Sequence, residues 1–436
     1  MPAPSEVYAL VVWLEALGAA PHRTAVAALA HLVAALLAGQ DLRAAGLMRA
    51  LLSPPAVPAR QRYKRVARAW GRPWLAPGWL TPRLVRAALA LVAPDPAPWP
   101  TAGLTHLVLD SVRCGRWELF TLGVAWHGRV LPVGWAVLPY PWPTGAFTPT
   151  ACALVRRVAA AWPAGRPAHL VADRAFPSRP LLRALGEVGW GYTLRLRAKH
   201  WVAVGHRASE IRSLLGGADR DRWTAAPALY GAHGAAPAGT LVLGRGLVVL
   251  PAWQANPGGA AARARRGAAR RSHLRRKHPG RRPDASSVTD SWVALFSTHP
   301  TWRTAVGSYK RRWTTEGSYR DAQGGWDGRH GWGLDRAVAR LTVAAEVERV
   351  LGLWAVGTLA QSWLGHQATQ PGQPATVAAA LGRWTTTGRL SVWARGQLAL
   401  AAPELRPWVA ATLRLGAERL AFPGAAATAP PPALAA

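Results

Sequence analysis

The sequence predicts an α/β protein in which a mixed β-sheet is flanked by helices, with an N-terminal helical domain and a largely β insertion domain. Residues 1 to about 90 have the apolar spacing of helices, broken by Pro and Gly. From residue 104 three strand patterns follow one another, and strands then alternate with helices. This alternation stops between about 200 and 300, where strand-like segments flank a long basic run. These changes of pattern define the predicted domains.

The N-terminal domain is predicted over residues 1–95 as a helical domain that binds DNA. Its helix at 60–72, RQRYKRVARAWGR, contains six Arg or Lys residues, which suits contact with phosphates, although a solvated helix face would have the same composition. The apolar stretch at 24–39 is short for a membrane span and contains His31, so we expect a buried helix and no membrane partner. The start of the chain lacks the basic segment of a signal peptide. The Pro-rich residues 93–103 predict a domain boundary.

The predicted sheet domain comes in two parts, 104–199 and 301–366, with the insertion between them. Seven elements are expected in the first part, of which the fourth and sixth are helices: 104–110, 117–126, 129–139, 149–162, 169–173, 178–189 and 191–197. The dipeptide His127-Gly128 is expected to form the hairpin turn between the second and third strands. The first and fourth strands each end on an aspartate, Asp110 and Asp173.

The insertion domain is predicted over 200–300, and it contains the basic run 261–283. This run has ten Arg or Lys residues and no acid, so we expect a mobile loop that phosphates would order. A strand is expected again at 291–299, followed by a helix. The C-terminal region 367–422 is expected to be helical, with two helices at 374–420, and the low-complexity tail 423–436 is expected to be disordered.

The charge of the chain points to an anionic partner. Lys and Arg total 53 against 21 Asp and Glu, which gives a net charge of +32. Nucleic acid is the first candidate because phosphate neutralisation dominates its binding, and an anionic membrane surface or a ribosomal location are the alternatives. The two cysteines, Cys114 and Cys152, have no metal-binding spacing, which excludes a cysteine zinc cluster and a disulfide framework and suits a reducing cytosol.

Acids are scarce in this chain, so Asp110 and Asp173 are notable at the ends of apolar strands. If the two strands are neighbours in one sheet, both side chains emerge at the same edge. Two converging carboxylates repel each other unless a cation lies between them, and a divalent ion with oxygen ligands would resolve that repulsion. Either aspartate alone could instead be a helix cap or a turn residue.

A third acid is expected at Glu316, in the segment YKRRWTTEGSYRDAQ. Tyr309, Arg312 and Glu316 have the spacing i, i+3 and i+7, so they share one face of a helix, which Arg320 and Gln323 continue. A lone Glu among arginines is usually a surface ion pair, but the aromatic neighbours of Glu316 favour a partly buried face. Two other acids, Asp321 and Asp327, are lower-ranked alternatives because neither keeps the Tyr-Arg-Glu spacing.

On these residues the chain resembles the DDE transposases of bacterial insertion sequences, in particular the insertion-sequence-four group. In that family the first Asp ends the first strand of an RNase H-like fold, as Asp110 is expected to do. The second lies in a D-x-G-F motif, which DRAF at 173–176 resembles with Ala175 in place of Gly. Tyr309, Arg312 and Glu316 match the first three letters of the motif Y-x2-R-x3-E-x6-K, whereas its Lys position is Gln323 here. The resemblance covers about 104–365.

This resemblance implies a transposase that cleaves DNA at element ends and transfers the strand into target DNA. It implies two Mg2+ ions, replaceable by Mn2+, held by Asp110, Asp173 and Glu316. The implied partners are double-stranded DNA, as terminal inverted repeats and target, and a second copy of the chain on that DNA, in the nucleoid of the bacterial cytoplasm. The residues expected to bind DNA are Tyr309, Arg312, Arg320 and Gln323, and, in the basic run, Arg265, Arg266, Arg270, Arg271, Arg275, Arg276 and Lys277.

Three other functions stay open on the sequence. Another RNase H-like nuclease would use the same carboxylates. A catalytically degenerate or host-recruited DNA-binding protein would explain Gln323 at the Lys position, although the presence of all three acids argues against it. A structural RNA-binding role would explain the charge and leave the acids unexplained. The sequence has neither the G-x-S-x-G motif of serine hydrolases nor the phosphate-binding loop of ATPases.

Overall fold

The computed structural model describes residues 4–51, 57–92, 101–217, 223–231, 237–245, 292–323, 331–382 and 391–421. The basic run 261–283, Asp327 and the tail 423–436 lie outside the described residues, and what the sequence indicates for them stays a prediction. The chain divides into two compact units. The first comprises Met1–Ala172, Pro180–Trp190 and Arg311–Ala436, and the second comprises Asp173–Arg179 and Gly191–Lys310.

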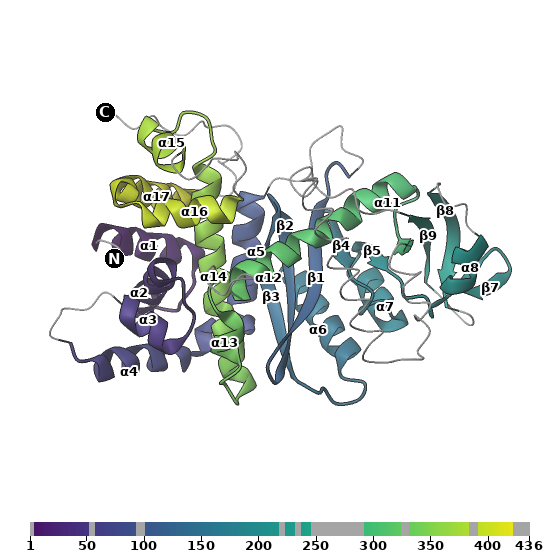
Figure 1. Cartoon of the computed structure of the whole chain (residues 1–436), viewed down its shortest axis with the longest axis horizontal. Coiled ribbons are helices and arrows are strands. Elements are labelled where there is room, and N and C mark those ends of the chain that lie inside the picture. Colours follow the sequence, from purple (N-terminus) through teal and green to yellow (C-terminus); the bar gives the residue numbers. More distant parts are fainter. Residues whose placement is uncertain are drawn as a thin grey trace, which may run out of the picture. The chain divides into compact units, whose positions relative to one another are not determined.

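Helices form the described N-terminal part of the first unit, as the apolar spacing predicts (Figure 1). They are α1 (Pro4–Leu17), α2 (Arg23–Gly39), α3 (Ala44–Ala50), α4 (Ala59–Trp70) and α5 (Pro77–Leu91). The apolar helix α2 is largely buried, as expected, whereas α4 buries only Val66 and Ala69. No single described helix is long and apolar enough to cross a membrane; α2 and α3 reach that length only together, and they are bent by 96°.

The C-terminal part of the first unit is also helical. It contains α13 (Leu334–Val338), α14 (Ala344–Gln367), α15 (Ala375–Gly382), α16 (Val392–Ala401) and α17 (Arg406–Ala421). The long helix α14 is buried along most of its length and packs against the sheet and the N-terminal helices. The prediction of two helices after residue 374 is wrong, because a 3₁₀ turn at Pro403–Leu405 separates α16 from α17 and makes a third.

The sheet of the first unit is mixed, and its strands lie in the order β3-β2-β1-β4. A meander of β1 (Thr105–Cys114), β2 (Trp117–Trp126) and β3 (Arg129–Pro139) is antiparallel, and β4 (Ala168–Ala172) pairs with β1 in parallel. His127 and Gly128 form the turn between β2 and β3 with φ of 44° and 79°, the positive values that a tight two-residue hairpin requires. The predicted hairpin is therefore confirmed.

Helices cover both faces of these strands. The helix α12 (Trp313–Gln323) crosses one face (Figure 1), and α5 and α6 (Phe147–Ala160) pack on the other around Gly134 of β3. A methyl group at Gly134 would lie 2.6 Å from Cγ2 of Val158 in α6, so the close packing of α6 requires glycine there. The helix α7 (Arg179–Glu187) follows β4 in the chain.

The second unit is mainly an antiparallel sheet with strand order β5-β10-β9-β8-β6-β7. Its elements are β5 (Gly191–Arg195), β6 (Trp201–Val204), β7 (Arg207–Glu210), α8 (Ile211–Gly217), β8 (Thr224–Tyr230), β9 (Ala238–Arg245), β10 (Trp292–Ser297) and α11 (Trp302–Tyr309). The helix α11 packs on this sheet, and Tyr309 at its end is only 1% exposed in a core formed with β9 and β10. The chain as a whole is therefore of the mixed α/β class.

Candidate active site

The strand β1 carries Asp110 on the face that α12 covers. Leu109 is the last residue of β1 that pairs with β4, opposite Ala172, so Asp110 stands one position beyond that parallel pairing. On its other side Asp110 pairs with Thr121 of β2. The prediction that the strand ends at Asp110 is wrong, because the hairpin with β2 continues β1 as far as Cys114. The strand that ends at this point is the neighbour β4, at Ala172.

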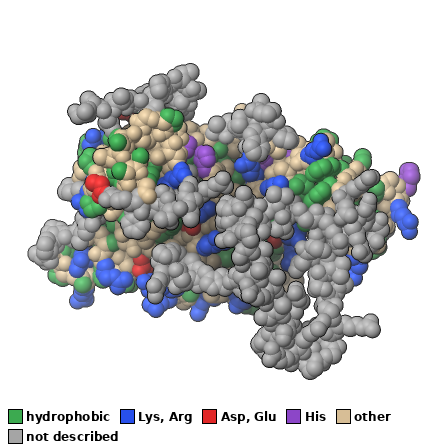
Figure 2. Space-filling view, turned by 45° about the horizontal axis from the view of Figure 1, so that its top comes forward, with side chains coloured by type: hydrophobic (Ala, Val, Ile, Leu, Met, Phe, Trp, Pro, Cys, Tyr) green, Lys and Arg blue, Asp and Glu red, His purple; other side chains and the backbone are tan. Residues whose placement is uncertain are grey.

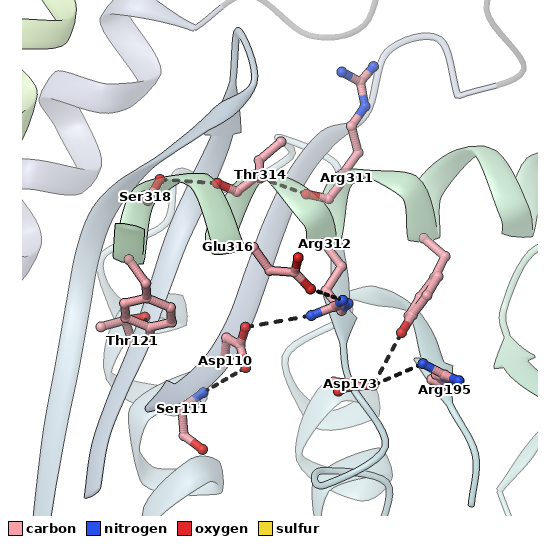
Figure 3. A network of polar contacts seen from close by, with 12 residues as sticks. Asp110, Ser111, Thr121, Asp173, Arg195, Arg311, Arg312, Thr314, Glu316 and Ser318 are labelled. Carbon is pink, nitrogen blue, oxygen red and sulfur yellow. Dashed lines mark hydrogen bonds and ion pairs between the residues drawn. The ribbon is translucent and has the colours of Figure 1, made fainter. Parts of the chain in front are cut away.

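A guanidinium group lies next to this aspartate (Figure 3). Nη1 of Arg312 is 3.8 Å from Oδ2 of Asp110, and Nη2 donates a 2.6 Å hydrogen bond to Oε1 of Glu316. The side chains of Arg312 and Asp110 are 10% and 15% exposed, whereas that of Glu316 is 56% exposed. Two acids that are far apart in the sequence therefore interact with one cation. Oδ1 of Asp110 also accepts a hydrogen bond from the backbone N–H of Ser111.

A short 3₁₀ turn makes this arrangement possible. The sequence predicted one helical face through Tyr309, Arg312 and Glu316, but α11 ends at Tyr309 and the turn Lys310–Arg312 precedes α12. Arg312 and Glu316 keep their i, i+4 contact across the start of α12. Tyr309 belongs instead to the second unit.

Two polar contacts attach α12 to the sheet beside the acids. The hydroxyl groups of Tyr319 and Thr121 are 2.6 Å apart, and Ser318 Oγ accepts a 2.8 Å hydrogen bond from the backbone N–H of Val130. Burial, followed by the nearby charge of Asp110, raises the pKa of Tyr319 well above its ordinary value, so its hydroxyl stays protonated. These contacts hold α12 against β2 and β3.

Asp321, a lower-ranked alternative for the third acid, is held elsewhere by α12. Its Oδ2 accepts a 2.5 Å hydrogen bond from Nε of Arg129 in β3. Burial raises the pKa of Asp321, although Arg129 opposes that shift. Asp321 is paired with Arg129 of β3, whereas Glu316 is paired with Arg312, the arginine beside Asp110. Glu316 therefore remains the better candidate.

Asp173 begins the second unit, directly after β4. Tyr309 Oη donates a 3.3 Å hydrogen bond to Oδ1 of Asp173, and Nη1 of Arg195 lies 4.0 Å from the same oxygen (Figure 3). The Asp173 side chain is 29% exposed, so solvent and ions can reach it. The sequence interpretation linked Tyr309 with DNA and overlooked Arg195. The alternation in β5, where Thr193 and Arg195 interrupt apolar residues, could have indicated a polar face.

The three predicted acids are divided between the units, with Asp110 and Glu316 in the first and Asp173 in the second. Among the described residues, no group of three or more His, Cys, Asp or Glu side chains could hold a metal ion. Metal binding by all three acids therefore stays a prediction. Two carboxylates already arranged around a cation do suit an ion that prefers oxygen ligands, and the exposed Glu316 can move away from Arg312 to receive one.

The other predicted DNA contacts differ in their surroundings. Arg320 is exposed on α12, whereas Gln323 is partly buried and its Nε2 lies 3.5 Å from Sγ of Cys114. Burial raises the pKa of this thiol to about 11. The seven predicted DNA-binding residues of the basic run lie outside the described part of the chain. On the face shown in Figure 2, Lys and Arg side chains are widespread and acids are few, in keeping with the composition.

No known protein-family model matches this chain, and no curated protein matches it either.

Proposed function

We propose that this chain is a DDE transposase that cleaves and joins DNA strands with the help of divalent metal ions, on an RNase H-like sheet. The observation that carries the proposal is the convergence of Asp110 of β1 and Glu316 of α12 on the single guanidinium of Arg312. A surface that only binds DNA gains nothing from acids near phosphate, because like charges repel unless a cation intervenes. A metal-dependent nuclease needs such acids to hold its ions.

The topology of the first unit supports the RNase H-like assignment. An antiparallel meander β1-β2-β3, joined by a parallel β4 next to β1, is the arrangement expected of that fold. The positions of two acids also agree with it. Asp110 follows Leu109 and Asp173 follows Ala172 in the chain, and Leu109 and Ala172 are partners in the parallel register.

Each residue has a proposed role. Asp110, Glu316 and Asp173 would hold Mg2+, which would supply activation of the attacking hydroxyl or water and stabilisation of the leaving oxygen. Tyr309 and Arg195 orient Asp173 through the contacts described above. Arg312 neutralises Asp110 and Glu316 before the ion and DNA arrive, and it then becomes available for a phosphate oxygen.

The proposed partner is double-stranded DNA, both the terminal repeats of the element and its target. The net charge of +32 suits this ligand, and Arg320 and the basic run 261–283 are the proposed backbone contacts. We also propose that two copies of the chain act together on DNA, in the nucleoid of a bacterium.

A non-catalytic DNA-binding protein is the second candidate. It is favoured by Gln323, which stands where the motif has Lys and whose amide lies beside Cys114. A protein of this kind would bind the same DNA ends and leave them intact when Mg2+ or Mn2+ is added.

The test is metal-dependent nicking of a supercoiled plasmid that carries the gene with its natural flanking DNA. We expect wild type to nick the plasmid near the gene ends in Mg2+, and Glu316→Gln to abolish nicking. Glu187→Gln is the matched control, because Glu187 is 55% exposed and is also paired with an arginine, Arg156. Equal nicking by the two variants would remove Glu316 from the site, and absence of nicking by wild type in either metal would favour the second candidate.

A further inference from the structure

A basic cavity lies among the N-terminal helices, in a part of the first unit that the proposed chemistry does not use. Its volume is about 570 Å³, and residues of α2 and α4 form much of its wall. In Figure 1 these helices lie near each other with α3 beside them. The volume is within the range of about 300–1,000 Å³ that is usual for small-ligand sites.

Three arginines give the cavity its charge. Arg65, Arg68 and Arg72 line it. Arg65 and Arg68 stand at i and i+3 on α4, and Arg72 follows the helix with extended backbone, just before the 3₁₀ turn Pro73–Leu75. Their guanidinium groups make no hydrogen bond or ion pair with any residue that the structure describes. The residues that line the cavity include no acid. Three neighbouring cations without a carboxylate repel one another, and an anion between them would remove that repulsion.

The start of α2 also lines the cavity. His22 caps this helix, and its Nδ1 accepts a 3.2 Å hydrogen bond from the backbone N–H of Ala25. The imidazole proton is thereby assigned to Nε2, which can donate to a ligand. His31, in the middle of α2, also lines the cavity. Desolvation, followed by the charge of Arg65, lowers the pKa of His31.

The remaining wall is apolar. Leu32, Leu51 and Trp74 line it, and Leu51 and Trp74 are almost fully buried. A bare inorganic anion would use only the basic side of such a cavity, whereas a nucleotide has a phosphate for the arginines and a sugar or base for the apolar side.

We propose that this cavity binds the phosphate group of a nucleotide unit, through Arg65, Arg68 and Arg72 together with the start of α2. The phosphate can belong to the backbone of DNA or to a free nucleotide. With DNA as the source, the inference rests on the proposed function and adds an anchor in the N-terminal helices. With a free nucleotide as the source, it stands independently of the metal site.

The experiment compares two double variants that lose the same charge from the same helix. Arg65→Gln/Arg68→Gln removes arginines that line the cavity, and Arg60→Gln/Lys64→Gln removes basic residues that do not line it; all four residues are exposed. Two ligands are titrated without divalent metal: labelled double-stranded DNA from the gene flanks, by fluorescence anisotropy, and adenosine 5′-monophosphate, by calorimetry. Because no metal is present, failure of cleavage does not affect the result.

We expect the cavity variant to bind one of the two ligands at least about tenfold more weakly than the control variant does, since two charge-assisted contacts are lost. If DNA is that ligand, the slope of the logarithm of its binding constant against the logarithm of the salt concentration should also decrease in magnitude by about one for each arginine removed. Ala28→Glu places a carboxylate in the cavity and leaves the arginines intact, so it should weaken the binding of the same ligand. Thermal melting checks that each variant is folded. Equal affinities of the two double variants for both ligands would overturn the proposal.

Discussion

Replacing Arg312 with Gln isolates the cation that stands between Asp110 and Glu316. Removing one partner of a fully buried ion pair costs about 3–5 kcal/mol, and an exposed i, i+4 pair contributes only about 0.3–0.5 kcal/mol. The pair of Arg312 with Asp110 lies between these limits, because both side chains are mostly buried but their charged atoms are 3.8 Å apart. We therefore expect Arg312→Gln to lower the free energy of unfolding by about 1–3 kcal/mol in metal-free buffer.

Divalent metal should reverse part of this loss. Without the guanidinium, Asp110 and Glu316 attract another cation more strongly, and an ion at ten times its Kd would restore about 1.4 kcal/mol. The assay is urea unfolding of wild type and variant in chelator and in Mg2+ or Mn2+. Arg320→Gln on the same helix is the control, since the loss of an exposed arginine should change stability by less than about 0.5 kcal/mol. A loss no larger than that of the control, or a loss that metal leaves unchanged, would refute this account of Arg312.

Three further predictions concern the elements around the site. Tyr319→Phe removes the 2.6 Å contact with Thr121 and should destabilise the chain by about 1–3 kcal/mol in urea unfolding. Tyr63→Phe, at a residue 50% exposed, should have no effect, and equal unfolding free energies of the two variants would contradict the role of this contact. Gly134→Ala forces a methyl group against Val158 and should lower the free energy of unfolding by about 1–3 kcal/mol in thermal unfolding. Gly186→Ala in α7, where nothing lies within 4 Å of the added methyl group, should be neutral or stabilising. Unchanged stability of Gly134→Ala would show that α6 can shift. Burial lowers the pKa of His299 from its ordinary 6.5 to about 4, so between these pH values the unfolded chain binds more protons than the folded chain. The free energy of unfolding should therefore fall as pH falls, with a slope from this group of up to about 1.4 kcal/mol per pH unit. His299→Gln should flatten the plot of unfolding free energy against pH, and an unchanged plot would contradict the assignment.

The hairpin and the strands of the meander could be predicted from local sequence. The apolar runs at 117–126 and 129–139 match β2 and β3, and the His127-Gly128 turn accounts for their register as far as Gly123, where a bulge shifts it. The end of β1 could not be predicted in this way. The carboxylate at Asp110 suggested a strand end, but pairing with β2, a contact outside the local pattern, carries the strand on to Cys114.

The site was predictable where the spacing is local and unpredictable where it depends on packing. The Arg312–Glu316 contact follows from i, i+4 spacing in a helix. The 3₁₀ turn at Lys310–Arg312 separates Tyr309 from this face, and nothing in the segment marks such a break, because it has no Pro and its Gly residues lie elsewhere. The pairing of Asp321 with Arg129 depends on how α12 lies on β3, which residue spacing does not reveal.

The proposed function depends on the claim that Asp173, together with Asp110 and Glu316, holds catalytic metal ions. The most direct measurement compares wild type and Asp173→Asn for binding to the gene-flanking DNA without metal, and for nicking of that DNA in Mg2+. We expect the variant to bind the DNA as well as wild type does, or more tightly because one negative charge is lost, and to nick none of it. Nicking by Asp173→Asn at the rate of a wild-type enzyme that requires Mg2+ would contradict the claim.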